Sequence, residues 1–264
     1  MSITRGETDR FLRFAVIGAP CSGHGVVRQA IDAHPRVVCH GDLLHENEQV
    51  RQAEYSYTLF DTHIAFLPFD QLYISAEQYL NRIFSVNGKN ERAVGVKLSY
   101  DKIIRYDMWS YLDAKVREGD FCVIHVDRNP VSCYVRARRA AQDRSRDRYR
   151  HHALMIEPED LVAYTREHIA TYRKIEQVCE YRIKVNYAEL RAKARLVADF
   201  VCPYLGLHPS GACYMWQKQP GPPLRRLVAN WDMLKRAVDS QVGMLMEQAE
   251  WETTAVTKSE ELCL

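Results

Sequence analysis

The stretch FAVIGAPCSGHGVVRQAIDAHP, residues 14–35, decides which fold the chain is expected to adopt. Residues 13–18 form a short apolar run that ends in glycine, as a buried strand of a parallel sheet does, and residues 23–33 repeat apolar side chains at helical spacing. Between the two, Gly18 and Gly23 stand at the spacing of a G-x-x-x-x-G phosphate-binding loop. The stretch therefore predicts a strand, a loop that can bind an anion and a helix in direct succession.

The loop departs from the pattern of ATP and GTP hydrolases directly after Gly23. His24 and Gly25 stand where those loops carry Lys and then Ser or Thr, which contact the γ-phosphate and Mg²⁺. Backbone N–H groups at a helix start still attract an anion, and Ser22 and His24 can donate further hydrogen bonds, with positive charge on His24 only when it is protonated. Nucleotide hydrolysis is disfavoured, and the alternatives are a phosphate-binding loop of another kind or a glycine-rich turn without a ligand.

The rest of the chain alternates strand and helix patterns, which implies a mainly parallel sheet with helices on both faces. Further strands are expected at 36–39, 93–99, 120–128 and 181–187, and helices at 101–118, from Pro130 onward, at 157–180, at 188–205 and at 231–248. Short aromatic helices or loops are expected within 43–93. The predicted fold is a P-loop-like three-layer α/β fold. Because the sequence has no internal repeat and no linker, a single domain that spans residues 1–264 is expected.

Composition and charge exclude several classes of protein. A net charge of +2 argues against a nucleic-acid binder that uses its whole surface. The arginine-rich segment 136–152 has few aromatic residues, which favours a solvated helix or a docking surface for an anionic acceptor over nucleic-acid binding. Eight irregularly spaced cysteines without a C-x-x-C pair indicate neither a zinc site nor a disulfide framework. With no signal peptide and no apolar run near the ~20 residues of a membrane span, a soluble, cytoplasmic protein is expected.

A second candidate anion site follows the fourth expected strand. The sequence HVDRNPVSCYVR, residues 125–136, places Arg128 at the carboxyl end of that strand and Ser132 one turn into the next helix. In a parallel sheet both lie at the same edge as the glycine loop, and a guanidinium suits phosphate oxygens. An Arg paired with a carboxylate and a Ser that caps a helix are the alternative. Two anion sites on successive strand ends favour a nucleotide with phosphates at both ends of its ribose.

Taken together, these segments resemble the sulfotransferases that use 3′-phosphoadenosine 5′-phosphosulfate (PAPS), especially the bacterial carbohydrate type that sulfates trehalose or nodulation-factor glycolipids. Residues 33–46 resemble the HP…CHGE segment of that family, residues 95–101 its third strand, and residues 184–207 and 223–234 its late strand and helices. Its P-R-S-G-T-T loop, which holds the 5′-phosphosulfate, corresponds to Pro20, Cys21, Ser22, Gly23, His24 and Gly25. Its R-x-x-x-S element, which holds the 3′-phosphate, corresponds to Arg128 and Ser132.

The resemblance also implies roles in catalysis. Asp42, in place of the Glu of the family, becomes the base that takes the proton of the acceptor hydroxyl, with His45 and then His40 as substitutes. His45 could instead orient the acceptor. Lys97 becomes the cation that stabilises charge developing on the leaving phosphate. PAPS is the implied co-substrate, no metal is implied, and the acceptor is a glycan or another small molecule.

Three functions are compatible with the sequence. The leading one is transfer of a sulfuryl group from PAPS to a hydroxyl of a carbohydrate, glycolipid or small molecule, in a protein that can form a homodimer. The second is a catalytically impaired relative that binds nucleotide or a partner, suggested by Cys21 and Asp42, which depart from the family pattern. The third is a degenerate P-loop kinase, against which the missing lysine argues.

Overall fold

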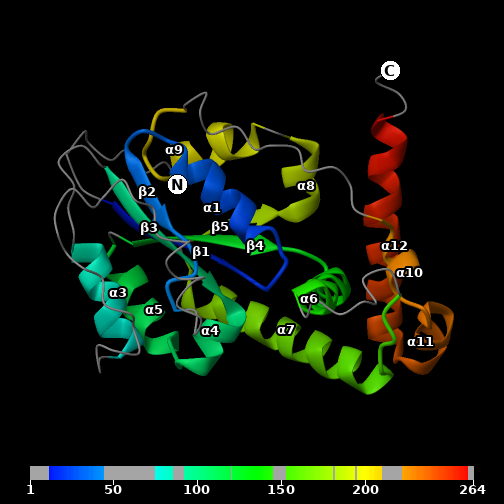
Figure 1. The fold of residues 1–264 in the computed structure, drawn as a ribbon. Coiled ribbons are helices and arrows are strands. Elements are labelled where there is room, and N and C mark those ends of the chain that lie inside the picture. Colours follow the sequence, from blue (N-terminus) through cyan, green and yellow to red (C-terminus); the bar gives the residue numbers. More distant parts are fainter. Residues whose placement is uncertain are drawn as a thin grey trace.

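The centre of the fold is a five-stranded, fully parallel sheet with the strand order β2-β3-β1-β4-β5 (Figure 1). The strands are β1 (Leu12–Gly18), β2 (Val37–His40), β3 (Ala93–Ser99), β4 (Phe121–Asp127) and β5 (Arg182–Asn186). The structure is a computed structural model that describes residues 12–44, 75–85, 92–119, 121–144, 153–180, 182–193, 195–209 and 222–260. All five strands lie within two residues of the expected positions, and the predicted mixed α/β class is confirmed.

Close packing between the central strands explains one residue choice. Gly95 pairs with Phe14 across β1 and β3, and a Cβ at Gly95 would lie 2.2 Å from the Phe14 ring. Both central strands are buried on both faces, as their apolar runs predict.

Helices cover both faces of the sheet, and each face encloses a separate hydrophobic core. One face carries α3 (Ala76–Ser85), α4 (Tyr100–Arg105), α5 (Trp109–Arg117) and α7 (Pro158–Val178). The other carries α1 (His24–Asp32), α8 (Tyr187–Ala192), the π-helical segment η3 (Val197–Val201) and α9 (Cys202–Tyr204). A third core lies beyond the sheet, between α6 (Pro130–Arg144), α7, α10 (Leu224–Leu227), α11 (Trp231–Ala237) and α12 (Ser240–Glu260).

Three of the expected helices are broken, each for a local reason. The helix expected at 101–118 stops at Asp107, which adopts φ +45, so that α4 and α5 are separate. The helix expected at 188–205 becomes α8, η3 and α9 because Lys193 has an extended backbone, and it ends at Gly206 with φ +68. The helix expected at 231–248 divides because Val238 is extended and the Asp239 carboxylate accepts the Val242 N–H at 3.0 Å, which starts α12 anew.

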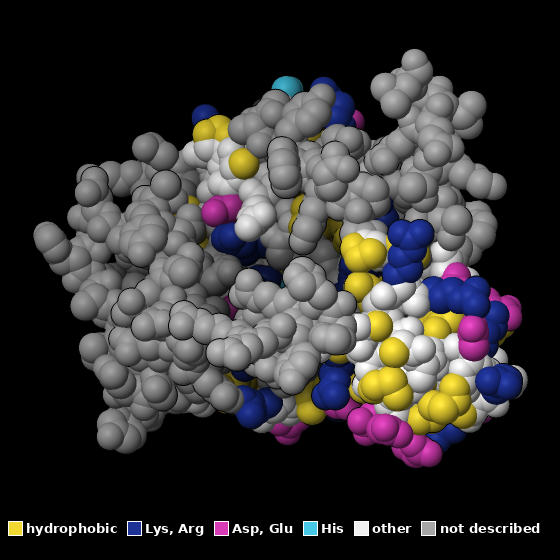
Figure 2. All heavy atoms as spheres, turned by 45° about the vertical axis from the view of Figure 1, so that its right-hand side comes forward, with side chains coloured by type: hydrophobic (Ala, Val, Ile, Leu, Met, Phe, Trp, Pro, Cys, Tyr) yellow, Lys and Arg dark blue, Asp and Glu magenta, His cyan; other side chains and the backbone are white. Residues whose placement is uncertain are grey.

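Acidic and basic side chains are mixed on the described part of the surface in Figure 2. Hydrophobic side chains are interspersed among them over the face that it presents. No helix among the residues described has the length and apolar character that crossing a bilayer requires.

A cluster of buried polar rings lies between β4, α4 and α7. The Tyr100 hydroxyl and His125 Nε2 are 2.6 Å apart, and the rings of Tyr100 and His168 are 5.3 Å apart. Burial lowers the pKa of His125 to about 3 and that of His168 to about 4. Both imidazoles are therefore neutral at pH 7.

These neutral histidines predict a loss of stability as the pH falls below 6.5. In the unfolded chain each takes up a proton near pH 6.5, whereas in the folded chain it stays neutral down to about pH 3–4, so the unfolded state binds more protons. Each histidine then lowers the free energy of unfolding by about 1.4 kcal/mol between about pH 8 and pH 5.5. In urea unfolding, the free energy of unfolding of His168→Gln should fall by about 1.4 kcal/mol less than that of the wild-type protein between about pH 8 and pH 5.5. An equal fall in both proteins would contradict a neutral His168.

Candidate functional site

The loop after β1 has the tight backbone path that the sequence indicates. The Ser22 N–H donates to the Ala19 carbonyl at 3.0 Å, and Cys21 and Gly23 both have positive φ, at +63 and +97. α1 begins at His24, directly after the loop. Turns of this kind gather backbone N–H groups at a helix start, which is how proteins bind anions without a lysine.

Two of the three loop glycines are required by space, and the third is not. A Cβ at Gly18 would lie 2.4 Å from Ser22 Oγ and 3.1 Å from the Val126 carbonyl. One at Gly23 would lie 2.4 Å from the ring of Tyr187. A Cβ at Gly25 would meet nothing within 4 Å, so neither space nor backbone conformation requires glycine there.

This contrast predicts opposite effects of the same substitution at two neighbouring positions. Gly23→Ala combines a left-handed backbone with a clash against Tyr187, and we expect it to lower the free energy of unfolding by about 1–3 kcal/mol. Gly25→Ala, the matched control, places a methyl group in open space within a helix, and should leave stability unchanged or raise it by about 0.5–1 kcal/mol. Urea denaturation of both variants measures the difference, and equal effects would contradict the loop geometry.

His24 is a neutral part of the loop and not a source of positive charge. Burial, followed by the nearby Lys97 ammonium, lowers the pKa of His24 to about 3. Its Nδ1 lies 3.0 Å from the buried Ser22 hydroxyl, with which it shares a hydrogen bond. The Ser22 side chain therefore holds His24 in place. The sequence-based idea that His24 restores charge to the loop holds only below the physiological pH range.

The two predicted catalytic residues that the structure describes lie together. Asp42 follows β2 and Lys97 comes from β3, and the Asp42 Oδ2 and Lys97 Nζ atoms are 3.7 Å apart. Both side chains are mostly buried, with exposed fractions of 17% and 14%. His40 is buried with its pKa lowered to about 4 by burial and the Arg28 charge, which makes it a weak base. His45 lies outside the described residues.

Arg128 is directed to the loop from the end of β4. Its Nη1 donates to the Cys21 carbonyl at 2.7 Å, and its guanidinium lies 3.7 Å from the centre of the Tyr187 ring. Its buried Nε has no hydrogen-bond partner among the described residues. The Asn129 side chain accepts the N–H of Ser132 at 3.2 Å, so Asn129, and not the buried Ser132, caps α6.

Arg136 is a candidate site residue that the sequence-based assignment missed. Its Nε is also buried without a partner among the described residues. Burial, then the charges of Arg128 and Arg191, lower the pKa of the Arg136 guanidinium, and no carboxylate is among the groups that act on it. We call Arg128, Arg136 and Arg191 the arginine cluster. Arg136 is repelled by two neighbouring cations with no described carboxylate acting on it, and the Nε atoms of Arg128 and Arg136 lack partners among the described residues, which fits a bound anion.

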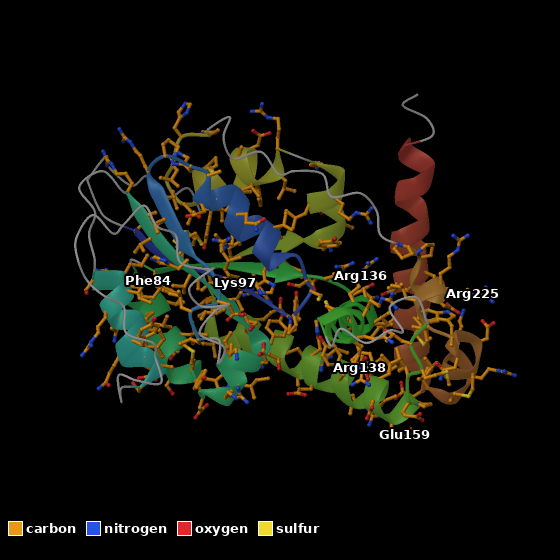
Figure 3. All side chains as sticks on the ribbon, viewed as in Figure 1. Phe84, Lys97, Arg136, Arg138, Glu159 and Arg225 are labelled. Atoms are coloured by element: carbon orange, nitrogen blue, oxygen red, sulfur yellow. The ribbon has the colours of Figure 1, made fainter. Side chains whose placement is uncertain are left out.

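The sequence feature that could have identified Arg136 as a site residue is its spacing from Arg128 and Ser132. Arg128, Ser132 and Arg136 stand four residues apart, which puts the last two on one face of α6. In Figure 3, Lys97 and Arg136 lie on opposite sides of the loop, as the strand order β3-β1-β4 requires. The described residues contain no group of His, Cys, Asp or Glu side chains that could hold a metal ion.

Comparison with known proteins agrees with the fold class. No protein-family model matches the sequence, and no curated protein matches it. The chain resembles the crystal structure of a sulfotransferase from Alicyclobacillus acidocaldarius, with a TM-score of 0.52 and 14% identity over 93% of this chain and 95% of that one. It also aligns with the sulfotransferase domain of the Synechococcus PCC 7002 olefin synthase, with a TM-score of 0.40 and 14% identity over 99% and 98% of the two chains.

The first similarity defines the class of fold. The chain has a sulfotransferase-like α/β fold, in which a parallel sheet places the glycine loop and the start of α6 at one edge. At 14% identity this similarity concerns the fold alone. The second, at a TM-score of 0.40, adds nothing to that conclusion.

Proposed function

We propose that the protein is a sulfotransferase that moves the sulfuryl group of PAPS to a hydroxyl of a carbohydrate, glycolipid or other small molecule. The arginine cluster beside the glycine loop is the observation that carries this proposal. At Arg136 no carboxylate of the described residues offsets the charge, and this supports binding of a second phosphate beside the neighbouring strand end. A nucleotide with phosphates at both its 5′ and 3′ ends suits two such sites, and the sulfotransferase-like fold supports the same choice.

The chain has a residue for each demand of the reaction. The loop from Pro20 to Gly25 offers backbone N–H groups to the 5′-phosphosulfate, and Arg128 and Arg136 offer their guanidinium groups to the 3′-phosphate. Asp42 takes the proton of the acceptor hydroxyl while the oxygen of that hydroxyl forms a bond to sulfur. The bond between sulfur and the phosphate oxygen breaks in the same step. Lys97 then stabilises the negative charge left on that phosphate.

Binding of nucleotide without transfer is the second candidate, favoured by the neutral state of His24. The loop has no charged side chain of its own, because Cys21 replaces a basic residue and His24 is neutral at pH 7. The same absence of a loop cation argues against a kinase, which holds the γ-phosphate with a lysine.

Calorimetry and a transfer assay separate these functions. Titration with adenosine 3′,5′-bisphosphate, the desulfated product, should give binding without Mg²⁺, whereas ATP should bind more weakly with or without it. Incubation with radiolabelled PAPS and a panel of glycans and phenols should then transfer label to a hydroxyl compound. Binding without transfer to any acceptor would leave the impaired nucleotide binder, and absence of binding would overturn both proposals.

A further inference from the structure

Cys21, in the glycine loop, is the one partly exposed cysteine among those that the structure describes. The other described cysteines lie inside the two cores beside the sheet: Cys39, Cys122, Cys133, Cys179 and Cys202. Cys213 and Cys263 lie outside the described residues. A thiol reacts with a reagent in solution only where the reagent can reach it, so Cys21 is the reactive candidate of the described set.

A guanidinium group that lacks one of its partners is directed at Cys21. Arg128 Nη1 donates to the Cys21 carbonyl at 2.7 Å, and Arg128 Nε makes no hydrogen bond with a described residue. Arg128 is more than nine-tenths buried, so an unsatisfied Nε is costly. The contact holds this cation against the loop, beside the residue that carries the thiol. A ligand with an anionic group satisfies it.

Two further features make the surroundings of Cys21 electropositive. The nine-residue helix α1 begins at His24, three residues after Cys21, and the start of a helix carries partial positive charge. Burial lowers the pKa of the Arg136 guanidinium, whereas Cys21 acts in the opposite direction, as a thiolate beside a cation does. The thiolate is the reactive form of cysteine, and reactive cysteines lie in partly exposed, electropositive surroundings of this kind.

We propose that Cys21 is a site of reversible modification by a small disulfide that carries carboxylate groups, such as glutathione disulfide. Cys21 loses its thiol proton to water, and the thiolate attacks one sulfur of the disulfide. The bond between the two sulfurs of the reagent breaks, and the released half takes up a proton as a free thiol. The products are a mixed disulfide on Cys21 and one reduced thiol. The carboxylates of the attached half suit the guanidinium groups of Arg128 and Arg136.

The modification closes the glycine loop to nucleotide, and this consequence rests on the proposed function. The attached group occupies the loop from Pro20 to Gly25, which the proposed function assigns to the 5′-phosphosulfate, and it uses the same guanidinium groups as the 3′-phosphate. The protein then binds nucleotide only while Cys21 is reduced. A thiol reverses the state by attack on the mixed disulfide. Cys21 thus makes sulfuryl transfer dependent on the ratio of small disulfides to thiols.

Peptide mapping by mass spectrometry tests the site in the full chain after incubation with glutathione disulfide. One glutathione should be attached to Cys21, and dithiothreitol should remove it. Cystamine, a disulfide with two positive charges, should modify Cys21 at least about tenfold more slowly, with each rate divided by that of the same disulfide with N-acetylcysteine. Attachment at Cys213 or Cys263 in place of Cys21, or an equal rate with cystamine, overturns the proposal.

A pair of arginine variants tests the source of the charge preference. Arg128→Gln should abolish the preference for glutathione disulfide over cystamine. Arg138→Ala is the control, because Arg138 is exposed on α6, and should keep it (Figure 3). The wild-type protein gives a second measurement that needs no variant: about 1 M salt should reduce the preference, because it screens charges near the surface. A preference that survives both changes is not electrostatic and overturns the role of Arg128.

Calorimetry separates failure of this inference from failure of the proposed function. Attachment of glutathione should weaken the binding of adenosine 3′,5′-bisphosphate at least about tenfold, and dithiothreitol should restore it. In Cys21→Ser the affinity should be the same before and after exposure to glutathione disulfide. Equal affinity of the reduced and modified wild-type protein overturns the control of the loop by Cys21, while sulfuryl transfer stands. If the reduced protein does not bind this nucleotide, the proposed function fails, and the modification site is decided by the peptide map alone.

Discussion

Arg136→Ala should weaken the binding of adenosine 3′,5′-bisphosphate by about 10²-fold. Truncating one side of a buried, charge-assisted contact removes about 2–5 kcal/mol of binding free energy, and every 1.4 kcal/mol is about tenfold in affinity. Arg136 is placed to make such a contact because its Nε is enclosed and unpartnered among the described residues. Calorimetric titration of the purified variant measures the loss directly.

Stability separates a binding role of Arg136 from a structural one. Because Arg128 and Arg191 repel Arg136 in the free protein, its removal should keep or raise the free energy of unfolding. Arg138→Ala is the matched control, since Arg138 lies on the same helix but is exposed (Figure 3). Nucleotide affinity should fall for Arg136→Ala only. Equal affinities of the two variants would remove Arg136 from the nucleotide site.

The arginine cluster also accounts for the unusual loop. At Cys21 and His24 the loop has lost the side-chain charge that the resemblance leads one to expect, and burial keeps His24 neutral. In the proposed function the charge comes instead from the end of β4 and from α6, where Arg128 donates to the Cys21 carbonyl and the Arg128 charge lowers the pKa of Arg136. The loop then contributes shape and backbone N–H groups, while the neighbouring strand end contributes charge.

The sheet could be predicted from the sequence because its signals are local. The strands β1 to β4 are apolar runs buried on both faces, whereas the edge strand β5 alternates buried and more exposed residues. Because the strands alternate with helices along the chain, strand positions and the parallel class follow without knowledge of distant contacts. The helix breaks were harder to predict. Asp107 interrupts an apolar pattern that continues across it, and only its left-handed backbone ends α4. Asp239 gave a usable capping signal, because it stands directly before the residues that begin α12.

The candidate site was predictable in position but not in electrostatics. Strand ends gather Asp42, Lys97, the loop and Arg128 at one edge because the sheet is parallel. The neutral state of His24 depends on burial by residues far away in sequence, which no local pattern reports. The role of Arg136 depends on separating one arginine from the arginine-rich segment 136–152, of which residues 136–144 are described.

Asp42→Asn should lower kcat by about 10²–10⁴-fold, which corresponds to about 2.7–5.5 kcal/mol of transition-state stabilisation. Asparagine has the shape of aspartate but cannot take the proton of the acceptor hydroxyl. The affinity for adenosine 3′,5′-bisphosphate should change little, because that molecule carries no acceptor. Single-turnover transfer of radiolabel from PAPS measures the step without the contribution of product release.

Asp127→Asn provides the control for the loss of an ion pair. Asp127 also lies at a strand end and pairs with a lysine of the neighbouring strand, Lys184, at 3.2 Å. If the ion pair of Asp42 with Lys97 serves only to hold the sheet edge together, the two variants should lose stability alike and keep their turnover alike. If Asp42 is the base, only Asp42→Asn loses turnover. Retained turnover in Asp42→Asn together with a large loss in His45→Asn would instead move the base to His45, because a second group on the same segment would then take the proton.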